Sequence, residues 1–254
     1  MRALVTGASM GIGEAVARIL SKKGYDLIIT ARSKERLEAL KEELPTDVRI
    51  VVCDLSQKDG PQKLYDEVKD LNIDILINSA GMGDCGEFIA SSFDKQYNMM
   101  MVNCMALMQL SYLFGGKMKD RGKGHILNIS SSAAFNAGAY MSVYYASKAF
   151  VLHFSNALAQ ELKDTGVSVT CLCPGAVDTG FMEKADMGAS SMHRFFPPAS
   201  SDKIASVGIK AMLKGRTMAL SGVGGHLLNL ASRMLPRALM EKIVADVNRK
   251  RVIR

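Results

Sequence analysis

The feature that most constrains this chain is an alternation of short apolar runs and helix-period segments that continues almost to its end. Strands alternating with helices require parallel pairing, and near-continuous apolar strands imply that both sheet faces are covered. We therefore expect an α/β fold with a single doubly wound parallel sheet, a Rossmann fold of about seven strands, with helices on both faces. The predicted strands are 3–6, 27–30, 48–53, 73–78, 125–130, 167–173 and 217–220. The main predicted helices are 13–23, 34–44, 61–71, 94–118 and 143–165.

The organisation of the chain is predicted to be a single domain over 1–254. With 254 residues, 48 % hydrophobic and 22 % charged, the sequence is too apolar for a disordered protein. The irregular segment 180–199 is expected to form a substrate lid, because long irregular segments beside a site commonly do. Residues 224–254 are expected to form a basic amphipathic C-terminal helical extension. No apolar run of about 18 residues predicts a membrane-spanning helix.

The cysteines and the N-terminal sequence predict a cytoplasmic protein. Five scattered cysteines without a CxxC pair are typical of reduced thiols. The first residues lack the basic-then-apolar layout of a signal peptide. Cys171 and Cys173 lie two apart in an apolar run, which places both on one face of a buried strand. No His or Cys stands at ligand spacing from them, so no metal site is predicted.

The net charge of +7 is concentrated at the C-terminal end. Residues 214–254 hold nine Lys or Arg against Glu241 and Asp246, and they contain no aromatic residue, so nucleic-acid binding is not expected. Apolar residues recur at helical spacing on both sides of Pro236, which predicts two helices. They could dock over the substrate cleft or a subunit contact, or attach peripherally to anionic lipid.

A Gly-rich turn follows the first strand and leads into a helix. In Thr6-Gly-Ala-Ser-Met-Gly-Ile-Gly13, the glycines allow a tight turn and close approach to a pyrophosphate, whose charge a helix N-terminus favours. A turn without any ligand is the alternative. The position at the first strand of a βαβ unit favours a dinucleotide.

The residues that follow the next strands concern the adenosine end of that dinucleotide. After the second strand stands Arg32, with no acidic residue until Glu35. Its planar fork suits a 2′-phosphate, so NADP(H) is favoured, while NAD(H) stays possible and a solvated arginine is the alternative. Asp54-Leu55 and residues 78–81 could contact the adenine or close the nucleotide pocket, or serve as ordinary turns.

A second group of residues carries proton chemistry. Tyr144 and Lys148 share one helix face. An ammonium about 4 Å away could lower the phenol pKa by about three units, which favours an acid/base role. Ser131, or its neighbours Ser130 or Ser132, could hold the substrate oxygen. Tyr65 and Lys69 have the same spacing, in an acidic helix far from a strand end, and are expected to be a solvated face.

Four motifs together resemble those of the short-chain dehydrogenase/reductase superfamily: TGASMGIG, NSAG, SSS followed by YYASK, and PGAVDT. Their order and spacing cover residues 2–179. Within the superfamily, the sequence of residues 126–135 and 143–162 is similar to a bacterial branch called DltE-like, related to ketoacyl and 17β-hydroxysteroid reductases. The resemblance implies a homodimer or homotetramer.

The resemblance also implies residue roles. Ser131 and Tyr144 would be catalytic, with Tyr144 as the acid/base, Lys148 would also bind the nicotinamide ribose, and Asn103 would hold a proton-relay water. The implied cofactor-binding residues are Gly7, Ser9, Gly11, Ile12, Gly13, Arg32, Asp54, Leu55, Asn78, Ala80, Gly81, Tyr144, Lys148, Pro174, Gly175, Val177 and Thr179.

Two positions depart from the pattern. Ser79 replaces the usual second asparagine of the Asn-Asn-Ala-Gly motif. Met10 stands where many NADPH-using members carry a basic residue, so Arg32 acts without that second cation, although Ser9 could donate a hydrogen bond to a 2′-phosphate.

The substrate is expected to be a small carbonyl or alcohol compound with an apolar body. Phenylalanines and methionines recur through the lid, although they could instead pack on the domain. His193 is interpreted as a lid surface residue. The predicted function is an NADP(H)-dependent oxidoreductase that interconverts a carbonyl and a secondary alcohol. The alternative is a non-catalytic NADP(H) sensor or docking protein that uses the basic tail.

Overall fold

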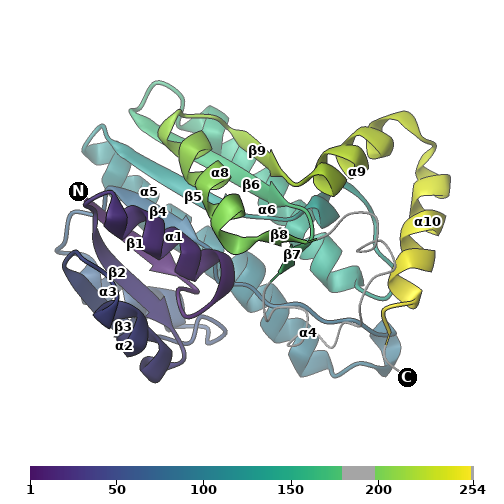
Figure 1. Cartoon of the computed structure of the whole chain (residues 1–254), viewed down its shortest axis with the longest axis horizontal. Coiled ribbons are helices and arrows are strands. Elements are labelled where there is room, and N and C mark those ends of the chain that lie inside the picture. Colours follow the sequence, from purple (N-terminus) through teal and green to yellow (C-terminus); the bar gives the residue numbers. More distant parts are fainter. Residues whose placement is uncertain (179–197, 253–254) are drawn as a thin grey trace.

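The computed structural model describes residues 1–178 and 198–252, and its centre is a parallel sheet between two helical layers (Figure 1). The strand order is β3-β2-β1-β4-β5-β6-β9, with every neighbouring pair parallel. This arrangement confirms the predicted doubly wound sheet. The strands are β1 (Arg2–Thr6), β2 (Asp26–Ala31), β3 (Val48–Val52), β4 (Ile75–Asn78), β5 (Gly124–Ile129), β6 (Val167–Pro174) and β9 (Met218–Ser221).

Each strand sends alternate side chains to opposite faces, and both faces are apolar. In β4, Ile75 and Ile77 join the core on one face, and Leu76 joins the core on the other. This double burial is why the strands are almost continuously hydrophobic. The first core lies under α1 (Gly11–Lys22), α2 (Lys34–Glu42) and α8 (Ser201–Leu213). The second lies under α3 (Gly60–Val68), α5 (Leu107–Asp120) and α6 (Ser142–Glu161).

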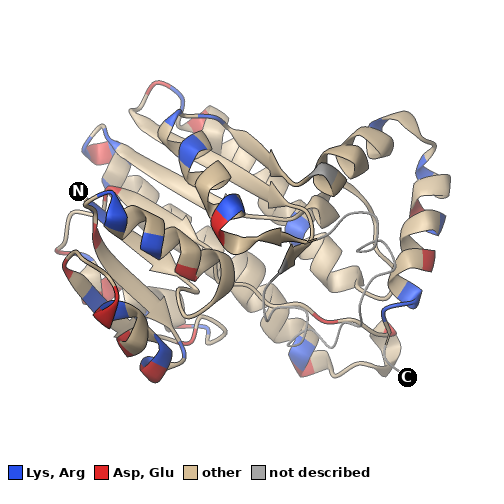
Figure 2. Cartoon of the chain, viewed as in Figure 1, with Lys and Arg blue, Asp and Glu red and all other residues tan. Residues whose placement is uncertain are grey.

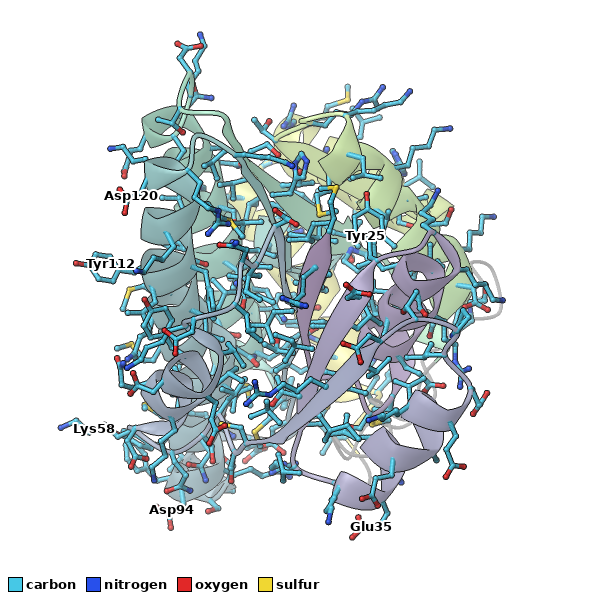
Figure 3. The ribbon with its side chains drawn as sticks, turned by 90° about the vertical axis from the view of Figure 1, so that its left-hand side faces the viewer. Tyr25, Glu35, Lys58, Asp94, Tyr112 and Asp120 are labelled. Atoms are coloured by element: carbon cyan, nitrogen blue, oxygen red, sulfur yellow. The ribbon has the colours of Figure 1, made fainter. Side chains whose placement is uncertain are left out.

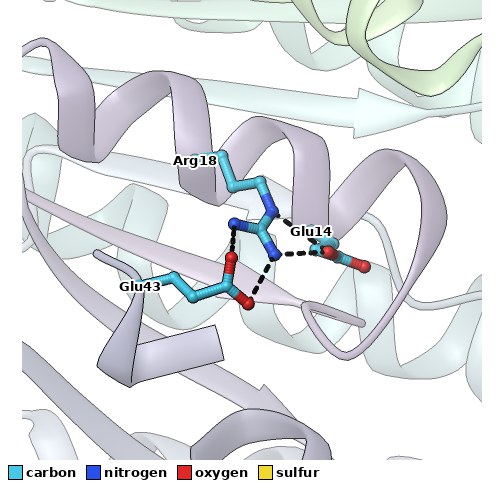
Figure 4. Close-up of polar contacts among 3 residues, drawn as sticks. All are labelled: Glu14, Arg18 and Glu43. Atoms are coloured by element: carbon cyan, nitrogen blue, oxygen red, sulfur yellow. Dashed lines mark hydrogen bonds and ion pairs between the residues drawn. The ribbon is translucent and has the colours of Figure 1, made fainter. Parts of the chain in front are cut away.

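An arginine fork ties α1 to the end of α2 (Figure 4). The Arg18 guanidinium donates to both carboxylate oxygens of Glu43, at 2.7 and 3.2 Å, and to Glu14 at 2.8 and 3.0 Å. Because such paired bonds fix orientation as well as distance, they hold these two helices against each other beside the Gly-rich turn.

The predicted helix 94–118 is divided in the structure. It consists of α4 (Phe93–Met100), a π-helical segment η2 (Met101–Ala106) and α5. No proline or glycine marks this segment, so hydrophobic periodicity could not reveal it. Two short 3-10 helices, η1 (Phe88–Ala90) and η3 (Ser132–Phe135), were also missed.

The continuous helical stretch Phe93–Asp120 is long and apolar enough to cross a membrane by length and composition, with mean hydropathy 1.2 over its best window. The sequence predicted a helix here, over 94–118, but no membrane-spanning helix. Since 56 % of that window is buried inside the domain, the stretch has the burial of a core helix.

Both ends of the predicted lid meet in a small second sheet. The strand β7 (Val177–Asp178) pairs in parallel with β8 (Ala199–Ser200). Most of the predicted lid, with Phe181, His193 and the other residues named for it between 179 and 197, lies outside the described residues, and so does Thr179.

The C-terminal segment forms α9 (Val223–Met234) and α10 (Arg237–Arg249), separated near Pro236 as expected. Lys and Arg recur along α10, whereas α9 carries Arg233 alone, near its end (Figure 2). The inner face of α10 buries Met240 and Val244 in a cluster that includes Tyr145. The segment is therefore docked on the domain. Its outer face exposes Leu230, Met234 and Ile243, so the lipid alternative stays an open prediction.

Candidate active site

The Gly-rich turn between β1 and α1 forms a narrow backbone cradle. Gly7 and Gly11 have φ of 67° and 62°, a conformation that favours glycine. A Cβ on Gly7 would lie 2.8 Å from Ala80 Cα, and one on Gly13 would lie 2.3 Å from Gly7 O. Ser9 and Ile12 lie within the same turn and the first turn of α1. A cradle that only glycine can line, at a helix N-terminus, fits a pyrophosphate.

A hydroxyl at the end of β1 joins this cradle to β4. Thr6 Oγ1 accepts hydrogen bonds from the N–H groups of Ser79 and Ala80 at 3.0 and 3.1 Å, and it donates to Ile77 O at 3.2 Å. At position 79 this contact uses the backbone N–H. It therefore does not depend on whether the side chain is serine or the family's usual asparagine.

The predicted adenosine end lies where β2 and β3 finish. Arg32 is exposed, and its charge reaches the carboxylate of Asp54. Burial opposes ionisation of Asp54, but hydrogen bonds from Ser56 and the charge of Arg32 together lower its pKa. The N–H and hydroxyl of Ser56 bind one carboxylate oxygen at 2.9 and 2.8 Å. Leu55 is buried beside it.

A second cation reaches this end from α2. Arg36 Nη1 lies 3.9 Å from Met10 Sδ. The position where Met10 lacks a charge thus has a guanidinium beside it, supplied by α2 instead of by residue 10. The sequence contained a signal for this second cation, because Arg32 and Arg36 stand four residues apart just after β2.

The side chain of Asn78 takes part in a buried hydrogen-bond network. Its side chain is buried and donates to Ser111 at 3.1 Å and to Asn128 at 2.8 Å. Asn128 donates onward to Ser155 at 2.9 Å. The amide therefore ties β4 and β5 to α5 and α6, and does not turn toward the cradle.

The structure brings Ser131, Tyr144 and Lys148 together at the end of β5. The Ser131 hydroxyl lies close enough to the Tyr144 phenol to lower its pKa, and it accepts a hydrogen bond from the N–H of Ala133 at 3.1 Å. Lys148 Nζ donates to Ile129 O at 3.1 Å and lies 5.8 Å from the centre of the Tyr144 ring.

The other two serines have different surroundings. Ser130 is buried, and its hydroxyl donates to the backbone carbonyl of Lys148 at 2.8 Å, which locks α6 onto β5. Ser132 begins η3, and its Cβ would lie 3.8 Å from a Cβ placed on Gly225. Of the three, Ser131 is the serine at the phenol.

Asn103 lies within the π-helical segment, and its side chain points toward the group formed by Tyr144 and Lys148. Its Nδ2 donates to Met82 O and Ser147 Oγ, both at 2.9 Å. The Ser147 hydroxyl donates to Tyr144 O at 2.7 Å. A Cβ on Gly81 would lie 3.5 Å from Asn103 Oδ1 and 3.6 Å from Lys148 Nζ. Asn103, Gly81 and Lys148 therefore converge, and Ser147 is a positioning residue that the sequence did not reveal.

The electrostatics differ from the sequence expectation. Burial raises the pKa of Tyr144 to about 12, although the hydrogen bond from Ser131 and the charge of Arg251 act in the opposite direction. Burial lowers the pKa of Lys148 to about 8. The expected lowering of the phenol pKa by the ammonium was therefore wrong for the chain alone, because desolvation outweighs charge and Lys148 bonds a carbonyl.

The remaining predicted residues lie near the same end of the sheet. Gly175, which follows Pro174 at the end of β6, donates its N–H to Ser221 O at 2.9 Å, and a Cβ on it would lie 3.3 Å from Gly225 N. Val177 lies in β7.

Two further sequence interpretations concern residues away from this group. Cys171 and Cys173 share one face of β6, with their Sγ atoms 3.8 Å apart. Within residues 1–178 and 198–252, no group of three His, Cys, Asp or Glu side chains could hold a metal ion. Tyr65 stacks edge-on against Phe114 and Lys69 pairs with Asp66 at 3.3 Å, as a pair on a structural helix would.

Comparison with known proteins gives one family. The sequence profile of the short chain dehydrogenase family matches residues 1–189. An uncharacterized oxidoreductase of Staphylococcus epidermidis is 33 % identical over 188 residues, which cover 73 % of this chain and 82 % of that protein. The 17-beta-hydroxysteroid dehydrogenase type 3 of Mus musculus is 35 % identical over 184 residues, covering 70 % and 60 %.

Solved structures agree over nearly the whole chain. A short-chain dehydrogenase from Sphingobium yanoikuyae, in complex with NADPH, superposes with a TM-score of 0.80 at 28 % identity and 94 % coverage of both chains. A bulky-bulky ketone specific alcohol dehydrogenase from Comamonas testosteroni gives 0.76 at 26 % identity, with 93 % and 95 % coverage.

Replacing Lys148 by Met tests its buried charge. Since the pKa of Lys148 falls from 10.5 to about 8 on folding, the unfolded chain holds more protons between these pH values. The free energy of unfolding therefore contains a contribution that rises with pH over this interval. Lys148→Met is expected to remove this rise and to add up to about 3 kcal/mol of stability at pH 7. Urea unfolding of both proteins from pH 7 to 10.5 measures it, and parallel pH curves would contradict it.

Proposed function

This chain belongs to the short chain dehydrogenase family and is an oxidoreductase, and from that premise we propose that it uses NADP(H) to interconvert a carbonyl and a secondary alcohol. The observation that supports the proposal most is the convergence of Ser131, Tyr144, Lys148 and Asn103 beside the glycine cradle. Ligands of doubly wound sheets bind at this carboxyl end of the strands.

NADP(H), when bound, supplies or accepts the hydride, and the chain's own residues do the rest. The cradle from Gly7 to Gly13 would hold the pyrophosphate. An ammonium carries three N–H donors, so Lys148 can donate to ribose hydroxyls in addition to Ile129 O.

The proton would move through Tyr144. Its pKa of about 12 keeps the phenol protonated at neutral pH, the form that donates to a carbonyl oxygen. Because the Ser131 hydroxyl lies beside the phenol, one oxygen placed between them would meet two donors. The phenolate left behind would then be stabilised by the nearby cations Lys148 and Arg251.

The preference for NADP(H) over NAD(H) is proposed from Arg32 and Arg36. Both guanidiniums stand at the adenosine end, where a carboxylate would instead favour a ribose hydroxyl. In support, the Sphingobium structure contains NADPH, and a serine dehydrogenase at 28 % identity and TM-score 0.78 contains NADP+.

The apolar character of the substrate is proposed from the wall beside Tyr144. Cys85, Met141, Met240 and Val244 form a buried apolar cluster that the Tyr144 ring joins. The names of two similar proteins, a hydroxysteroid dehydrogenase and a bulky-bulky ketone specific dehydrogenase, are consistent with such a substrate.

We also propose a cytoplasmic location and assembly into a homodimer or homotetramer. Exposed apolar side chains on α4 and α5 offer a surface for a second copy. Phe93 is 72 % exposed, and Tyr112, which points away from the ribbon in Figure 3, is 80 % exposed.

Tyr144→Phe tests the acid/base role. Turnover is expected to fall by about 10²- to 10⁴-fold, because the proton donor is lost. NADPH binding, followed by fluorescence titration, is expected to remain. Tyr65→Phe, which removes a hydroxyl from the other Tyr–Lys pair, serves as the control. NADPH oxidation is measured over a panel of ketones.

The panel also separates catalysis from the sensor alternative. Undiminished turnover by Tyr144→Phe would contradict the assignment. Tight NADPH binding without oxidation by any ketone would favour the non-catalytic sensor.

Arg36→Gln tests cofactor choice. Loss of one exposed cation from a phosphate site is expected to weaken NADPH binding by about 5-fold, while NADH binding stays unchanged. Arg32→Gln is expected to weaken NADPH binding to a similar extent. Lys41→Gln removes a charge elsewhere on α2 and is expected to change neither NADPH nor NADH binding. Titration calorimetry gives all the constants. Equal weakening of both cofactors would refute a 2′-phosphate contact.

A further inference from the structure

The last described turn of the chain returns to the catalytic tyrosine. Asn248, near the end of α10, is fully buried, accepts from the Tyr145 hydroxyl at 3.4 Å and donates to Ala139 O at 3.0 Å. Arg251 donates its backbone N–H to Asn248 O at 2.9 Å. Val252 then packs in the apolar cluster that contains Tyr144 and Tyr145. These contacts hold the backbone of Arg251 against the start of α6.

The guanidinium of Arg251 differs from those of its neighbours. On α10, which ends two residues before Arg251, Arg237 pairs with Glu241 at 2.8 Å and Arg249 pairs with Asp246 at 3.0 Å. Within residues 1–178 and 198–252, Arg251 makes no ion pair, and its Nε is buried without a hydrogen-bond partner. The Arg251 residue is half-buried, and a buried N–H donor without an acceptor is unfavourable, so its Nε–H lacks a partner that an anionic group could supply.

The charge of Arg251 is close enough to the Tyr144 phenol to act on its ionisation. It acts on both tyrosines and opposes, without overcoming, the effect of burial on the pKa of Tyr144. Its surroundings are apolar, namely the cluster with Met141 and Val244. A ligand there would need an anionic group for the guanidinium and an apolar body for the wall.

We propose that Arg251 binds an anionic group of the substrate, so that the enzyme selects an apolar carbonyl or alcohol compound bearing a carboxylate or phosphate. The planar fork of arginine suits the paired oxygens of either group. That the ligand is a substrate rests on the proposed function, but the anion site itself can be tested without turnover.

The kinetic test compares 4-oxononanoate with its uncharged methyl ester, using NADPH oxidation. The wild-type chain is expected to have the higher kcat/KM for the acid. In Arg251→Gln the acid-to-ester ratio of kcat/KM is expected to fall by about 10-fold or more, because a charged hydrogen bond is lost. Arg251→Lys is expected to retain part of the ratio. Lys250→Gln removes an exposed charge one residue away and is expected to leave the ratio unchanged.

The binding test needs no reaction. Octanoate, octyl phosphate and methyl octanoate are titrated by calorimetry into the chain loaded with NADP+. At least one anion is expected to bind more tightly than the ester and to lose this advantage in Arg251→Gln but not in Lys250→Gln. The anion that binds more tightly identifies carboxylate or phosphate.

Several results would overturn the inference. These are equal binding of anions and ester by the wild-type chain, equal losses in Arg251→Gln and Lys250→Gln, or an acid-to-ester ratio that Arg251→Gln does not change. Anion binding that depends on Arg251, in a chain that reduces no ketone, would support the site while the proposed function failed.

Discussion

This end of the molecule depends on the hydrogen bond that the Lys148 ammonium donates to the backbone of β5. The Lys148 residue is only 6 % exposed. It donates to Ile129 O at the end of β5, and the Ser130 hydroxyl donates to the backbone carbonyl of Lys148. A Cβ at position 81 would lie 3.6 Å from Lys148 Nζ, so the loop after β4 packs closely against the ammonium. Burial lowers its pKa to about 8, so the charge weakens the fold at neutral pH. A charge kept in such a place is characteristic of a functional site.

The phenol beside it shows how desolvation and charge compete. Two cations, Lys148 and Arg251, approach Tyr144 from α6 and from the end of α10, yet burial raises its pKa to about 12. The chain alone therefore stores the proton rather than releasing it. Proton release would need further positive charge at the site, which an oxidised nicotinamide would contribute when bound.

Much of the fold and part of the site could be predicted from local patterns. Apolar strands buried on both faces gave the doubly wound sheet, and helical spacing placed Tyr144 beside Lys148. The π-helical turn at Asn103, the approach of Arg36 to Met10 and the return of Arg251 to Tyr144 could not be predicted, because each depends on packing between elements distant in sequence. The hydrogen bonds of the Asn78 side chain could not be predicted for the same reason. Its partners lie on α5 and β5.

The most direct measurement is a titration of the Tyr144 phenol by phenolate absorbance, taken as wild type minus Tyr144→Phe, with and without NADP+. We expect a pKa near 12 for the chain alone and a fall of about two units or more with NADP+. In Lys148→Met the fall should be much smaller. A pKa that NADP+ does not move, or a fall that persists without Lys148, would contradict a phenol made acidic by the charges assembled around it.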